Sequence, residues 1–201
     1  MAITLQECNS LVRGNFNPYI VNPQWLADQD IWRPDAAQFM LGVLGRGIRF
    51  RGDGVEWVVD HDRLIVSSVR EDCGELAARI LEHLPHTPVR AVGSNFTFVG
   101  DKHRWGDAPV PMLGAQGPDA FPEGQRPTEV RWSGTFLAPD HREEITLVVG
   151  DDSIAVRVNM HRPASKAEEV VFAARQFTHD KATAGDRVRQ LLAQEVQQVE
   201  S

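Results

Sequence analysis

The chain has 201 residues, of which 42% are hydrophobic and 24% charged, with a formal net charge of −7 at pH 7. These values are ordinary for a soluble globular protein that forms one large domain or two small ones. The acidic balance disfavours nucleic-acid binding, which requires clustered lysines and arginines against phosphates.

The first 46 residues carry weak patterns. Residues 1–10 are polar and predict a loose lead-in, and residues 11–16 predict a short strand. Asn22 followed by Pro23 is typical of a helix start, because Asn caps free N–H groups and Pro suits the first helical position. Pro34 predicts a second short helix through residue 44, weakened by three glycines.

The clearest folding unit runs from Gly47 to Val99, where the pattern predicts three strands, a helix and a fourth strand. Residues 55–59 alternate apolar and polar, which indicates a half-buried strand. Asp72 predicts a helix N-cap, with Glu75 placed to complete a capping box. Leu76, Ile80 and Leu84, with Ala77 and Leu81 beside them, form one apolar helical stripe.

The composition changes after residue 100. Residues 101–127 are rich in proline and glycine and predict a long loop or linker. Residues 130–136, 145–149 and 154–160 alternate like strands, and the last two form a hairpin. Residues 168–178 fit a helix or a strand, and we favour the strand as a third antiparallel partner. From Thr183 onward the stripe of apolar residues predicts a helix.

These elements predict an α+β fold, with a mostly antiparallel sheet in two lobes, each backed by one main helix. We expect an N-terminal lobe over residues 1–100, a loop or linker over 101–127 and a C-terminal lobe over 128–201, with one continuous domain as the alternative. No run approaches the roughly 18 apolar residues of a membrane span, and no signal peptide is evident. Cys8 and Cys73 are interpreted as reduced thiols. We therefore expect a cytoplasmic protein that contacts no membrane.

The densest titratable cluster is Asp60, His61 and Asp62, which could support general-base or metal chemistry. A polar hairpin turn explains the same three residues, because adjacent strand residues point to opposite faces. His83 and His86 have a spacing that suits zinc, but Pro85 between them interrupts the helix. We therefore expect no metal and no cofactor.

Cys73 lies where a helix N-terminus lowers a thiol pKa, although a buried structural role is commoner. The sequence contains none of the short phosphate-binding, nucleophile-elbow or zinc-protease motifs.

Tryptophans mark the remaining candidate surface. Trp32 and Trp105 lie in polar, proline- or glycine-containing surroundings, which suggests exposure, although packing under a loop explains them equally well. The function favoured by the sequence is a non-catalytic binding or assembly protein that works through contacts with a protein partner or with itself. The alternative is a small hydrolase or metal-dependent enzyme using the cluster around His61 with His83, His86 or His103. The expected contact residues are Trp25, Trp32, Trp105, Met112, Leu113 and Phe121.

Overall fold

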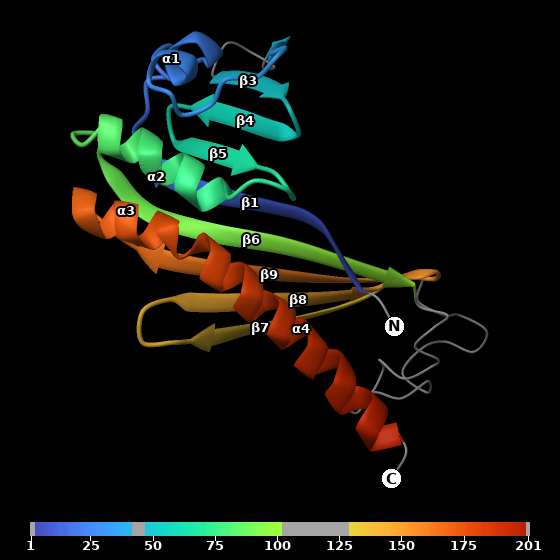
Figure 1. The fold of residues 1–201 in the computed structure, drawn as a ribbon. Helices are drawn as coiled ribbons and strands as arrows, with labels where there is room; N and C mark the ends of the chain where they lie inside the picture. Colours follow the sequence, from blue (N-terminus) through green and yellow to red (C-terminus); the bar gives the residue numbers. More distant parts are fainter. Residues whose placement is uncertain (1–2, 42–46, 102–128, 200–201) are drawn as a thin grey trace.

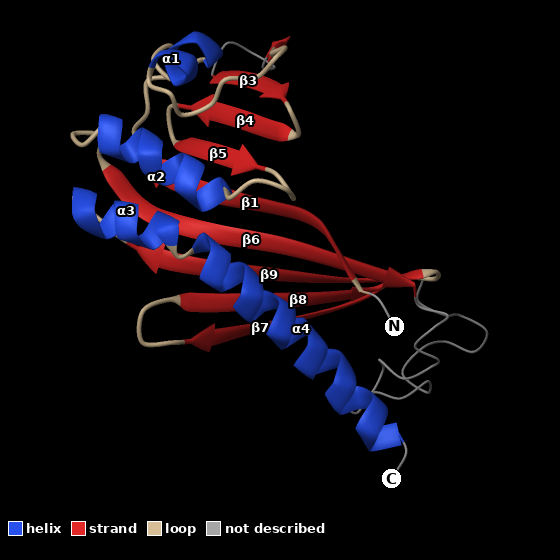
Figure 2. Ribbon diagram, viewed as in Figure 1, coloured by secondary structure: helices blue, strands red, loops and turns tan. Residues whose placement is uncertain are grey.

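One antiparallel sheet runs through the whole protein. The computed structural model describes residues 3–41, 47–101 and 129–199, and within them nine strands have the order β2-β3-β4-β5-β1-β6-β9-β8-β7. The helices α2, α3 and α4 lie across one face of this sheet (Figures 1 and 2). The elements are β1 (Thr4–Gly14), α1 (Pro23–Asp28), β2 (Gln38–Leu41), β3 (Gly47–Gly52), β4 (Val55–Asp60), β5 (Arg63–Ser67), α2 (Cys73–His83), β6 (Val89–Asp101), β7 (Val130–Leu137), β8 (Arg142–Val149), β9 (Ser153–Pro163), α3 (Ala167–Arg175) and α4 (Phe177–Val199).

The predicted α+β class, with a mostly antiparallel sheet and helices packed on it, is confirmed. Each half of the chain contributes a three-stranded meander followed by a helix, β3-β4-β5-α2 and β7-β8-β9-α3. The two halves share the sheet, because β6 pairs with β9 from Ala91↔Pro163 to Asp101↔Ser153. The proposed division near residues 100 and 128 stays a prediction.

Strand β1 lies at the centre of the sheet, so the prediction of a loose lead-in over residues 1–10 is wrong. It pairs with β5 on one side and with β6 on the other. Its inner side chains at Cys8, Ser10 and Val12 are buried, while Glu7 and Arg13 are exposed. The inner residues include small polar ones, which is why hydrophobicity alone did not reveal this strand.

Helix α2 follows the predicted cap, since the Asp72 carboxylate accepts hydrogen bonds from the N–H groups of Gly74 and Glu75, both at 2.9 Å. Ile80 is fully buried against the sheet. Leu76 and Leu84 are half-buried and pack at the margin of the core, so the buried stripe is rotated slightly from the predicted one.

A strand replaces the short helix predicted after Pro34. Residues 38–41 form β2, which pairs with β3 from Gln38↔Arg51 to Leu41↔Ile48. Without β2, the outer side of β3 would have unpaired backbone groups, and the glycines that follow make a helix costly. The predicted helix residues Val43 and Leu44 lie outside the described residues.

Residues 168–178 are helical, so the favoured strand is wrong. Val170, Ala173, Ala174 and Phe177 are buried with helical spacing, and the Glu169 carboxylate accepts from the Lys166 N–H at the start of α3. Strand β9 already has β6 and β8 as neighbours, so it offers no free edge for another strand. The predicted C-terminal helix is confirmed and begins earlier, at Phe177.

The helices within the described residues are too short or too polar to cross a membrane.

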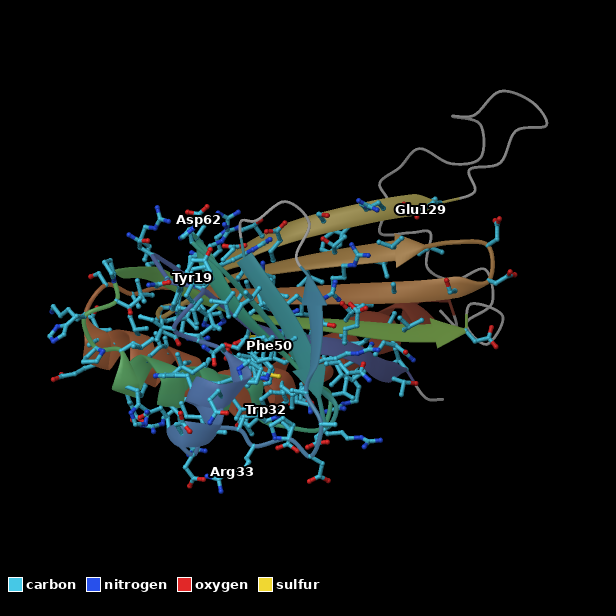
Figure 3. The ribbon with its side chains drawn as sticks, turned by 90° about the horizontal axis from the view of Figure 1, so that it is seen from above. Tyr19, Trp32, Arg33, Phe50, Asp62 and Glu129 are labelled. Carbon is cyan, nitrogen blue, oxygen red and sulfur yellow. The ribbon has the colours of Figure 1, made fainter. Side chains whose placement is uncertain are left out.

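The sheet twists strongly, so the direction of β3 and β4 differs from that of β8 and β7 (Figure 3).

Candidate functional site

The acidic cluster of the alternative enzyme hypothesis forms the turn between β4 and β5. Asp60 Oδ1 accepts a hydrogen bond from the Asp62 N–H at 2.9 Å, and Asp60 Oδ2 forms an ion pair with Arg63 Nε at 2.7 Å. His61 and Asp62 are exposed, and Asp62 lies far from Trp32 and Arg33 in Figure 3. The Asp60 carboxylate therefore holds the turn together, as the polar-hairpin interpretation anticipates.

His83 and His86, at the C-terminal end of α2, do not form a metal site with the acidic cluster. His83 is the last residue of α2, is exposed, and places its ring edge-on to Trp25 with centroids 6.2 Å apart. His86 is also exposed, and His103 lies outside the described residues. Across residues 3–41, 47–101 and 129–199, no three His, Cys, Asp or Glu side chains gather where they could hold a metal ion.

Trp32 is a core residue, so the suggestion that its ring is exposed is wrong. Only 9% of it is exposed, and its ring centroid lies 5.9 Å from Phe50 and 5.6 Å from Trp57. Figure 3 shows Trp32 beside Phe50, where the segment after α1 folds back over the sheet. Trp25 is half-buried and packs against the core. Their part in binding stays a prediction.

The other four expected contact residues belong to the proline- and glycine-rich segment. These are Trp105, Met112, Leu113 and Phe121, and all four lie outside the described residues.

A cavity of about 420 Å³ between the segment after α1 and helix α2 collects several charged side chains. Three of them, Asp72, Glu75 and Arg79, have structural partners. Asp72 caps α2 and also accepts from Thr178 Oγ1 at 2.6 Å. Glu75 pairs with Arg175 at 3.1 Å, and Arg79 donates to the Ile31 carbonyl at 3.3 Å. These contacts hold helices and loops together.

A buried ion pair joins β9 to α4. The Arg162 guanidinium donates from Nη1 and Nη2 to the two carboxylate oxygens of Asp180, at 2.6 and 2.8 Å, and the two side chains are 7% and 1% exposed. Asp140 lies 3.4 Å from Arg162, and its pKa is lowered because the His141 ring donates a hydrogen bond to it. Sequence reasoning missed this pair, although a charged residue at an inward position of a strand was a usable signal.

Among the described residues, β7 is one of the two edge strands of the sheet, and β2 is the other. None of the eight residues of β7 is buried, whereas β8 beside it buries four inward side chains. Leu137 is 86% exposed and Phe136 48% exposed. On the helix side of the strand, a Cβ added at Gly134 would lie 2.6 Å from the Trp132 ring, so the indole lies directly over the glycine backbone. This edge combines exposed apolar side chains with open backbone groups.

The charged groups described above hold elements of the fold together. Among the described residues, β7 has a strand neighbour on one side only. The sequence matches no protein-family model and none of the curated proteins.

Proposed function

We propose that this protein is a non-catalytic binding or assembly protein that acts through protein–protein contacts, with β7 as its contact surface. The observation that carries the proposal is the unpaired outer side of β7. Within the described residues, this strand pairs with β8 alone. An exposed edge of this length is a template for adding another strand.

The hairpin between β7 and β8 defines which backbone groups face outward. The Ala138 N–H donates to the His141 carbonyl at 2.9 Å, which marks that pair as hydrogen-bonded. Hydrogen-bonded and non-hydrogen-bonded pairs alternate along an antiparallel ladder. The next pair, Leu137↔Arg142, is therefore non-hydrogen-bonded, so Leu137 directs its N–H and carbonyl away from β8. By the same alternation, the other outward backbone groups belong to Arg131, Ser133 and Thr135.

The side chains of β7 do little to protect this edge. Natural edge strands are often blunted by lysine, proline or inward-pointing charges. Strand β7 reads VRWSGTFL, with Arg131 as its one charged residue and no proline. Its last two residues, Phe136 and Leu137, are both exposed apolar groups. Exposed apolar side chains on an edge strand are more typical of a protein–protein interface than of a surface that faces water.

The occupant that the strand itself suits is β7 of a second copy, related by a two-fold axis. In an antiparallel pair centred on Ser133, Arg131 of each copy would lie opposite Thr135 of the other, so the arginines would not oppose each other. Val130 would lie opposite Phe136 on the helix side. Trp132 would lie opposite Gly134, whose helix-side face is covered by the Trp132 indole of its own strand, so the two indoles would come together at this interface. Arg131, Ser133 and Thr135 of each copy would then complete their backbone hydrogen bonds, and Leu137 would lie opposite Glu129 of the other copy.

The test is sedimentation velocity of the full chain over a range of protein concentrations. We expect reversible dimers for the native sequence. Phe136→Lys places a charge opposite Val130 of the other copy, and Thr135→Pro removes one outward N–H without disturbing the β8 ladder. Each is expected to weaken the dimer by about tenfold or more, since about 1.4 kcal/mol corresponds to one decade.

The matched control is Phe172→Lys on α3, because Phe172 is 65% exposed but lies away from any strand edge. It should leave the dimer intact. A monomer at every concentration would overturn self-association through β7. Dimers that withstand both β7 substitutions but dissociate in Phe172→Lys would move the contact surface to α3.

A further inference from the structure

Two cysteines from distant parts of the chain meet beneath the first turn of α2. Cys8 lies on the inner face of β1, and Cys73 is the first residue of α2. The Cys8 Sγ lies 2.7 Å from the Ser68 carbonyl oxygen, and the Cys73 Sγ lies 3.3 Å from the same oxygen. The two sulfurs are therefore no farther apart than these two distances combined. Both thiols are free.

We propose that Cys8 and Cys73 form a redox-active dithiol site, which a small peroxide oxidises to a disulfide. A disulfide brings two sulfurs to about 2.05 Å, so the bond forms when side-chain rotation and a shift of α2 close the remaining distance. The contacts with one carbonyl oxygen bring together two cysteines that are 65 positions apart in the sequence.

The surroundings assign different roles to the two thiols. The pKa of Cys8 is lowered, chiefly because the Cys73 thiol donates a hydrogen bond to the Cys8 sulfur, with a further contribution from the Lys181 ammonium against the opposing effects of burial and Asp72. The same hydrogen bond and burial raise the pKa of Cys73. Since the thiolate is the nucleophile, Cys8 attacks the oxidant and Cys73 follows as the resolving thiol.

Burial limits which oxidants can reach the pair. Cys8 is 2% exposed and Cys73 is fully buried. A folded oxidoreductase cannot reach sulfurs buried to this degree. The oxidant is therefore a molecule as small as hydrogen peroxide, which enters when the packing around α2 opens locally.

The chemistry balances with peroxide as the sole oxidant. The Cys8 thiolate attacks one peroxide oxygen, so that an S–O bond forms, the O–O bond breaks, and the departing hydroxide takes up the proton that Cys8 lost. The Cys73 sulfur then attacks the Cys8 sulfenic acid. An S–S bond forms, the S–O bond breaks, and the hydroxyl leaves with the Cys73 proton as water. Two thiols are oxidised by two electrons in total, and one peroxide becomes two waters.

The disulfide would tie the first turn of α2 to the central strand of the sheet. Cys73 is adjacent to Asp72, which caps α2 and also accepts a hydrogen bond from Thr178 in α4. Oxidation therefore acts at the point where α2, α4 and β1 meet.

The test treats the full reduced chain with hydrogen peroxide in native buffer and measures its intact mass and its peptide map. We expect the loss of two hydrogens, a crosslinked peptide containing Cys8 and Cys73, and recovery of both thiols with dithiothreitol. In Cys73→Ser, we expect no disulfide and a Cys8 sulfenic acid that dimedone traps. In Cys8→Ser, Cys73 should react with peroxide at least about tenfold more slowly than Cys8 does in the native chain, because the Cys73 thiol stays protonated.

The native chain alone can decide the matter, even if a variant folds poorly. Thiols that resist peroxide in native buffer and oxidise only in denaturant would overturn the proposal. A disulfide between two chains, seen as a dimer on a non-reducing gel, would overturn it as well. Circular dichroism of each variant identifies any that has lost its fold and is left out of the comparison of rates.

Discussion

Gly74 tests the close approach of α2 to the end of α3 and the start of α4. It is the second residue of α2 and is buried, and a Cβ added there would lie 2.2 Å from both the Ala174 carbonyl oxygen and the Phe177 Cβ. Real Cβ atoms essentially never approach other heavy atoms so closely. One of the two neighbours is backbone, so a side-chain rotation cannot relieve the contact. We therefore predict that Gly74→Ala pushes α2 away from the end of α3 and the start of α4.

The sign of the effect is the informative part. In an unconstrained helix, replacing glycine with alanine stabilises by up to about 1 kcal/mol, because alanine loses less conformational entropy. Overpacking a well-filled core costs about 1–3 kcal/mol. We expect the second effect to exceed the first, so that Gly74→Ala destabilises by roughly 1–2 kcal/mol. In a protein of this size, that lowers Tm by about 2–8 °C.

Gly185 in α4 is the matched control. A Cβ added there would meet only the flexible end of Arg189, at 3.7 Å, so Gly185→Ala should stabilise by about 0.5–1 kcal/mol. Urea unfolding followed by tryptophan fluorescence measures both, with unchanged m-values as the sign that only stability has moved. If Gly74→Ala stabilises the protein as much as Gly185→Ala does, α2 does not pack closely against Ala174 and Phe177.

Two further predictions use the same unfolding assay. Ile80→Ala should destabilise by about 2–5 kcal/mol through lost burial and a cavity, because Ile80 is fully buried; a change near zero would mean that α2 presents another face to the sheet. Asp180→Ala should cost about 3–5 kcal/mol, because it strands the buried Arg162 guanidinium. Its control is Asp186→Ala, which breaks an exposed pair with Arg189 and should change stability by less than about 1 kcal/mol; equal losses in both variants would refute the assigned difference.

The elements that could be predicted are those whose pattern is local. The β4–β5 hairpin, the Asp72 cap and the β8–β9 hairpin each carry their turn residues and alternation within a short window. The pair Val59↔Leu64 and its neighbours are fixed by a two-residue turn, so nothing distant in the chain is needed to place them. Sequence reasoning therefore recovered both meanders and the α+β class.

The elements that were missed depend on distant partners. Strand β1 carries polar residues, and it is a strand because β5 and β6 satisfy its backbone on both sides. Residues 167–175 alternate well enough for a strand, but no strand edge is available beside β9. Trp32 stands in polar surroundings in the sequence, yet the chain folds it onto Phe50 and Trp57. In each case, tertiary packing overrides the local signal.

The same distinction explains why neither proposed site was evident from the residues alone. Residues 130–137 alternate much as residues 142–149 do, so the pattern predicts two similar strands. What separates them is their place in the sheet, because β8 has two neighbours and β7 has one among the described residues. Strand order is set by long-range pairing, which no short window contains.

Cys8 and Cys73 show most clearly what could not be predicted from the sequence. The sequence favoured two reduced thiols with no bridge between them, and Cys73 was interpreted as a buried structural residue at a helix start. Their meeting requires that β1 be the central strand and that α2 return across it, and the first of these was not predicted. Once both are in place, Ser68 leaves β5 so that its carbonyl oxygen lies against both sulfurs. The chemistry of the pair therefore follows from the topology, and a failure of the peroxide experiment would bear on the site at Ser68 without affecting the proposed role of β7.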